Sequence, residues 1–132
     1  MRFGRSFSLR IAPVVALTCS AVLLFFSARL SNTLEAATLM CFALGLAAAT
    51  EGPYWTAAAE VGGRQMGAAS ATLNTGGNTG GFLGPLLTPA IASWIGWEWG
   101  LYAGCLVVLG GVVTCLGVSL RPDPAAPAQE LA

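Results

Sequence analysis

Long runs of apolar residues, separated by short polar gaps, make up most of this 132-residue chain. Arg29 and Glu35 flank the first gap, Glu60 and Arg64 flank the second, and Glu98 stands in the third. Each run is long enough for the helix of about 20 residues that crosses the hydrocarbon core of a membrane. Because lipid forces backbone polar groups to bond within their own segment, the pattern predicts an all-α membrane protein. We expect four transmembrane helices within 11–120, at about 11–30, 36–59, 66–94 and 99–120.

Composition supports the same class of protein. Only 9% of the residues are charged, whereas soluble domains carry roughly a quarter of their residues as charged side chains. A surface with so little charge excludes a water-soluble monomer and makes the lipid bilayer the expected partner. All six basic residues are arginines, and six acidic residues balance them. Since no basic patch stands out, we expect no nucleic-acid partner.

The arginines indicate how the helices are oriented. With a cytoplasmic N-terminus, only Arg29 would lie outside, and the inner side would hold Arg2, Arg5, Arg10, Arg64 and Arg121. Because basic residues favour the cytoplasmic side, we expect a multi-pass cell-membrane protein with both termini in the cytoplasm. Residues 1–10 would then be a cytoplasmic N-terminal segment, and the Pro/Ala-rich residues 121–132 a disordered cytoplasmic tail.

The first apolar run also has features of a secretory signal peptide, since it follows an arginine-bearing start. Its apolar stretch is longer than a typical signal core, and Arg29-Leu30-Ser31 makes a poor cleavage site. We therefore expect the first helix to remain in the mature protein.

Residues that carry enzyme chemistry are scarce. The chain has no histidine, and its four cysteines lie inside apolar runs without the close spacing of a metal or redox site. It also lacks a nucleophile-elbow motif, a phosphate-binding glycine loop and a pair of carboxylates suited to acid–base work. We expect neither catalytic activity nor a bound cofactor or metal.

The second apolar run contains a charge where charge is costly. A carboxylate such as Glu51 costs at least about 2.5 kcal/mol near the centre of a membrane, so it should face other helices or a wet cavity. Pro53 follows Gly52 and leaves the carbonyl of Ala49 without its helical donor. A carboxylate beside such a break predicts a substrate- or proton-binding site, shaped by Tyr54 and Trp55. Alternatively, Glu51 pairs with a polar neighbour or extends to the cytoplasmic interface.

The third run has two amides and a glycine stripe. Asn74 and Asn78 are four residues apart and share one helical face, where they could bind a polar ligand or bond another helix. Gly76, Gly80 and Gly84 form a second stripe with the small-residue spacing that allows helices to approach closely. We expect this stripe to be buried against another helix of the chain.

Residues 51–97 carry a family resemblance. The stretch EGPYWTAAAEVGGRQMGAASATLNTGGNTGGFLGPLLTPAIASWIGW resembles the tenth and eleventh helices of major facilitator superfamily transporters, and more narrowly those of anion:cation symporters. The resemblance implies that the four helices correspond to about the ninth to twelfth, a partial C-terminal bundle. It implies that the tenth helix borders the central cavity and that the eleventh flanks it.

The expected function follows from that resemblance. It implies a fragment of a proton-coupled secondary transporter, whose full-length relatives move small organic anions such as sugar acids together with protons. The chain would represent a truncated gene or a start assigned too late, and its partners would include the other helices of a complete transporter. Two alternatives stay open: a non-transporting membrane interaction module or decayed gene fragment, and a small four-helix exporter that works as a dimer.

Overall fold

The computed structural model describes residues 3–117, with side chains from Arg10 onward. Within that range the chain is helical apart from short turns, and no strand occurs. The elements are α1 (Phe3–Ser27), α2 (Thr33–Ala48), α3 (Glu51–Gly62), the short 3₁₀ helix η1 (Gly63–Gln65), α4 (Met66–Ile95) and α5 (Trp97–Gly117). The all-helical class expected from the sequence is confirmed for these residues.

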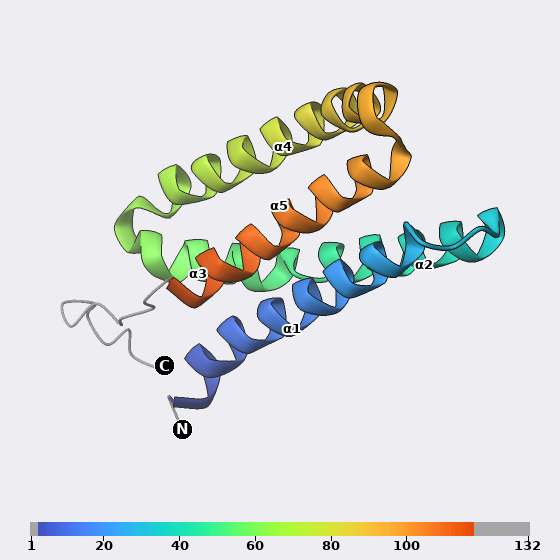
Figure 1. Ribbon diagram of the computed structural model, residues 1–132. Helices are drawn as coiled ribbons and strands as arrows, with labels where there is room; N and C mark the ends of the chain where they lie inside the picture. The colour runs from blue at the N-terminus through green and yellow to red at the C-terminus, as the bar shows by residue number, and fades with distance from the viewer. Residues whose placement is uncertain (1–2, 118–132) are drawn as a thin grey trace.

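The helices form an up-and-down arrangement (Figure 1). α2 and α3 follow one another along α1 in the opposite direction, the chain reverses at η1 into α4, and it reverses again into α5. α1 packs against both α2 and α5, while α4 contacts α3 and α5. One end of the bundle therefore holds the start of α1 and η1, and the other holds the α1–α2 and α4–α5 connections.

The helices have the length and apolar character needed to cross a membrane. In the described part of the chain, three helical stretches meet this requirement: Arg10–Ser27, Trp97–Gly117 and the 63-residue stretch Thr33–Ile95. The last stretch turns back on itself at η1. These lengths agree with the membrane location that the sequence predicts.

Helix boundaries differ from the expected spans in two places. α1 begins at Phe3, so residues 3–10 lie in the same helix as the first expected span. The second expected span is divided at Ala49 and Thr50 into α2 and α3. The expected disordered tail, 121–132, lies outside the described residues.

Local sequence signals account for several helix ends. The Oδ1 atom of Asn32 accepts a hydrogen bond from the Leu34 backbone N–H at 3.0 Å, and its amide donates to Glu35 at 3.1 Å. Asn32 therefore acts as the N-cap of α2 and satisfies one free backbone N–H, while Glu35 holds the Asn32 side chain in place. α4 ends at Gly96, whose φ of 103° is a conformation that glycine adopts without a steric penalty.

The buried interior lies where α1 meets α2 and α5. Leu17 and Ala21 of α1, Ala43 of α2 and Cys105 of α5 are all buried. Small residues allow the helices to approach, because a Cβ placed on Gly104 of α5 would lie 3.2 Å from the side chain of Leu24. Each helix contributes small or branched side chains to this contact, so α1 is the centre of the packed part of the molecule.

Candidate functional site

A break between α2 and α3 places Glu51 at the start of a helix. Thr50 is buried, and its hydroxyl donates to the carbonyl of Ala47 at 2.7 Å, as does its own backbone N–H at 3.1 Å. Glu51 is the first residue of α3, and Pro53 follows within the first turn, where a helix needs no N–H donor. The carboxylate of Glu51 therefore lies at the positive end of the α3 dipole, which favours negative charge.

Glu51 is exposed, and its carboxylate forms no hydrogen bond or ion pair with any other residue of the described chain. In a membrane-spanning helix, an exposed carboxylate needs either water or a further polar partner, because lipid cannot solvate it. The interior position that we expected for Glu51 is therefore not supplied by the helices described here.

The two aromatic residues after the break behave differently. The hydroxyl of Tyr54 lies 3.2 Å from the sulfur of Cys115, which links α3 to α5 across the bundle. Trp55, the next residue, is 44% exposed and has room to contact something outside this chain. Tyr54 thus contacts another helix of the chain, whereas the Trp55 side chain lies at the surface, where it can contact a ligand or another helix.

One of the two amides, Asn78, lies at about the depth of Glu51, whereas the other, Asn74, lies nearer to η1. A Cβ on Gly62 would lie 2.9 Å from the Cβ of Ala69, which fixes where α3 and α4 cross at the η1 end. With a rise of 1.5 Å per residue, Glu51 lies about 17 Å from this crossing along α3, and Asn78 lies about 14 Å from it along α4. Asn74 lies one turn nearer to the crossing than Asn78. The three residues thus lie about 8 to 17 Å from the crossing, in a band about 9 Å deep.

Neither amide is covered by the chain itself. Asn74 and Asn78 are both exposed, and neither side chain forms a hydrogen bond with another residue of the described chain. At 100° per residue, they lie about 100° and 140° around α4 from Leu73, which is half-buried and faces the bundle. The amides therefore occupy a flank of α4 that points away from its neighbours.

The glycine stripe is not packed, which corrects the expectation drawn from its spacing. Gly76, Gly80 and Gly84 are exposed, and a Cβ placed on any of them would have no neighbour within 4 Å. Gly80 and Gly84 do lie on the side of Leu73, within about 20° of it around the helix. The stripe therefore faces the bundle, but the middle of α4 lies too far from the neighbouring helices for the glycines to make contact with them.

Close packing of α4 occurs at its two ends. At one end Gly62 of α3 approaches Ala69, and at the other Gly100 of α5 lies so near to Thr88 that a Cβ would be 3.1 Å from its carbonyl oxygen. Sequence reasoning missed both glycines: Gly62 has no glycine at helical spacing, and Gly100, which repeats at four residues with Gly96 and Gly104, was not considered. Their nearness to the chain reversals at η1 and Gly96 was the available signal.

A shallow hollow of about 550 Å³ lies on α4 itself, lined by Ala71, Thr72, Thr75, Gly76 and Thr79. The hydroxyl of Thr72 donates to the Ala68 carbonyl at 3.0 Å, and that of Thr79 donates to the Thr75 carbonyl at 2.8 Å. Two of the hydroxyls thus bond their own helix, and the hollow offers a ligand little polar chemistry.

The described residues contain no group of three metal-binding side chains. Cys105 is buried and its thiol points to the Ala21 carbonyl at 3.6 Å, while Cys19 and Cys41 are exposed. Comparisons of the chain with protein-family models, with curated proteins and with solved structures give no match. The candidate site is therefore defined by geometry alone: one carboxylate, two amides and an exposed tryptophan, spread over about 9 Å of depth.

Proposed function

We propose that this chain is a membrane-embedded part of a proton-coupled secondary transporter of the major facilitator type, which moves small organic anions. α1, the α2–α3 pair, α4 and α5 would each cross the membrane, with both termini in the cytoplasm. The five-to-one distribution of arginines supports that orientation. The family assignment is supported by the motif resemblance over residues 51–97.

One observation carries the proposal: the polar groups that lie deep in α3 and α4 are uncovered. Glu51, Asn74 and Asn78 are all exposed, although the segments that hold them are otherwise apolar. Buried polar groups in membranes normally face a bundle interior or a water-filled path, where they bind substrates or relay protons. Additional helices on the α3–α4 side would turn this exposed band into the wall of a central cavity.

The chemistry of the band suits a weakly held anion and a proton. Asn74 and Asn78 can each donate two N–H groups, which match carboxylate oxygens, and Glu51 can carry the coupled proton. The chain has no lysine, and its arginines avoid the middle of the helices: Arg10 begins the membrane-length stretch of α1, Arg29 follows α1, and Arg64 lies in η1. In this proposal the cation that clamps the substrate comes from the helices that complete the transporter.

The proposal is tested in a complete transporter that carries this segment. Glu51→Gln and Asn78→Ala should each lower uptake of a sugar acid about tenfold, equivalent to about 1.4 kcal/mol of lost stabilisation. Glu51→Gln should also flatten the dependence of uptake on pH, because glutamine cannot carry a proton. Glu98→Gln is the matched control, since Glu98 stands in the first turn of α5, away from the band.

Membrane insertion is measured in parallel by the yield of protein in the membrane fraction. Normal insertion with unchanged uptake in both variants would reduce Glu51 and Asn78 to structural residues and remove the proposal. The 132-residue chain alone should give no uptake, because alternating access requires two bundles to move around a central site. Saturable, proton-dependent uptake by the chain alone would instead support the small dimeric exporter.

A non-transporting interaction module is the second candidate, favoured by the open middle of α4. A helix whose glycines face an unfilled space can accept another membrane helix. Under this alternative, replacing Gly80 would change the affinity of the chain for a partner helix. Replacing Glu51 would leave uptake by a complete transporter unchanged.

A further inference from the structure

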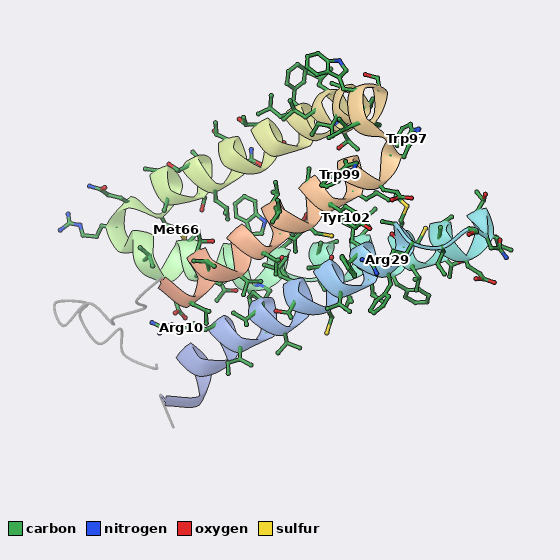
Figure 2. All side chains as sticks on the ribbon, viewed as in Figure 1. Arg10, Arg29, Met66, Trp97, Trp99 and Tyr102 are labelled. Carbon is green, nitrogen blue, oxygen red and sulfur yellow. The ribbon has the colours of Figure 1, made fainter. Side chains whose placement is uncertain are left out.

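A chain of aromatic contacts at the end opposite to η1 holds Arg29 in a fixed place. The guanidinium carbon of Arg29 lies 4.6 Å from the centre of the Phe25 ring. Phe25 in turn contacts Tyr102 of α5 with ring centres 5.5 Å apart, and Tyr102 meets Trp99 edge-on at 5.9 Å. We call these four residues the rim cluster. Figure 2 labels three of them, Arg29, Trp99 and Tyr102, with Trp97 nearby and with Arg10 and Met66 towards the other end.

Arg29 has no anionic partner in the described chain. The nearest candidates in sequence and fold are Glu35 and Glu98, and neither forms an ion pair with it. The Oε1 atom of Glu35 instead accepts from the amide of Asn32, as part of the cap of α2. The contact with the Phe25 ring uses no hydrogen bond, so the N–H donors of Arg29 are left without a partner in the described chain.

The rim cluster lies where a membrane surface would be. Trp94, Trp97 and Trp99 follow one another around the α4–α5 turn and are 88%, 66% and 56% exposed. Exposed tryptophans gathered at one end of an apolar bundle are typical of the boundary between lipid tails and head groups. In a membrane, Arg29 would therefore stand at the level of the phosphate groups, held there by Phe25.

A row of exposed apolar side chains on α1, which we call the apolar lane, runs from near Arg29 towards the middle of the helix. Phe26, Val22 and Val15 lie on one side of α1 at spacings of four and seven residues, and each is about half exposed. A lipid whose phosphate rested at Arg29 could lay an acyl chain along these three side chains. The rim cluster and the lane thus match the two ends of one phospholipid molecule.

We propose that the rim cluster binds the phosphate of an anionic phospholipid, with Arg29 as the donor and Phe25, Tyr102 and Trp99 as its support. A planar guanidinium can donate two parallel N–H groups to two phosphate oxygens. A zwitterionic head group already pairs its phosphate with its own ammonium, so a single arginine favours a head group with net negative charge. The binding is independent of any transport activity, because it involves none of Glu51, Asn74 and Asn78.

The test uses tryptophan fluorescence of the full 132-residue chain in phosphatidylcholine vesicles. Trp55, Trp94 and Trp97 are replaced by phenylalanine, so that Trp99 alone reports on the rim cluster. A small fraction of lipid with brominated acyl chains, either phosphatidylglycerol or phosphatidylcholine, is added as the quencher. We expect apparent binding of the brominated phosphatidylglycerol to be about five-fold stronger, from about 1 kcal/mol per arginine at an anionic surface.

Variants separate the role of Arg29 from general effects of charge. Arg29→Gln should abolish the five-fold preference, and Arg29→Lys should keep part of it, because lysine retains the charge but not the planar fork. Arg64→Gln is the matched control and should leave the preference unchanged, since Arg64 lies in η1 at the opposite end. Helix content measured by circular dichroism establishes that each variant remains folded.

The outcomes are distinct. Equal quenching by the two brominated lipids, or a preference that survives Arg29→Gln, would overturn the proposal. A preference that Glu98→Gln removes as fully as Arg29→Gln would also overturn it, because Arg29 would then be acting as a partner of Glu98. Addition of inorganic phosphate identifies the source of the ligand: an unaffected preference assigns the site to the lipid, and a lost preference assigns it to phosphate groups in general.

Discussion

Two regions of this molecule have similar compositions but opposite environments. Where α1 meets α2 and α5, the small residues Ser20, Ala21 and Ala43 are buried. In the middle of α4, the small residues Gly76 and Gly80 are exposed and have no neighbour within 4 Å of a Cβ position. Small size therefore permits close packing but does not produce it. The approach of a second helix depends on where the chain reversals place that helix.

The difference also extends to polar groups. In the α1 region, the Ser20 hydroxyl donates to the Ala43 carbonyl of another helix at 2.7 Å. On α4, Asn74 and Asn78 have no such partner within residues 3–117. Apolar surroundings make an unsatisfied polar group costly, so the α1 region is complete by itself whereas α4 requires something further.

The largest effect should come from filling a close contact. Gly100→Leu places a side chain against the Thr88 carbonyl, where a Cβ already lies 3.1 Å from the oxygen, so the α4–α5 contact must open. Overpacking of this kind costs about 1–3 kcal/mol in the free energy of unfolding. Gly110→Leu on the same helix is the matched control, because a Cβ on Gly110 has no neighbour within 4 Å. Unfolding is followed by circular dichroism in detergent, and equal stability of the two variants would contradict the packing described for α5.

A smaller effect should follow loss of the hydrogen bond between α1 and α2. Ser20→Ala removes the donor to the Ala43 carbonyl and should lower the free energy of unfolding by about 0.6 kcal/mol, the average for such bonds between membrane helices. The control is Ser93→Ala, since the exposed Ser93 hydroxyl bonds only the nearby Ala90 carbonyl of its own helix. A larger loss in the control would show that the two regions are not different in the way proposed.

The smallest effect should come from the open glycines. Gly80→Leu should leave the stability of the isolated chain unchanged or raise it slightly, because the new side chain meets open space and glycine is a poor helix former. The spacing of the stripe taken alone predicts the opposite result. Thermal unfolding in detergent at two protein concentrations checks this prediction. A marked loss of stability would mean that a second helix covers the middle of α4 in solution.

Sequence alone determined the class of this protein. Apolar runs of membrane-spanning length and scarce charge were sufficient to predict an all-helical chain, and Pro53 predicted a weak point in the backbone bonding beside Glu51, although not the division into two helices. These features depend on local chemistry: lipid forces backbone bonds into helices, and a proline removes one donor. The position of Asn74 and Asn78 on one face was also predictable, because helical geometry fixes it.

Only the tertiary structure decided which surfaces are covered. The spacing of Gly76, Gly80 and Gly84 gave no information on the distance to a neighbouring helix, since that distance depends on the turns at η1 and Gly96. Contacts such as Tyr54 with Cys115 and Phe25 with Tyr102 join residues far apart in sequence, so no local pattern reveals them. Helix periodicity assigns each side chain a direction, whereas the packing of whole helices determines what lies in that direction.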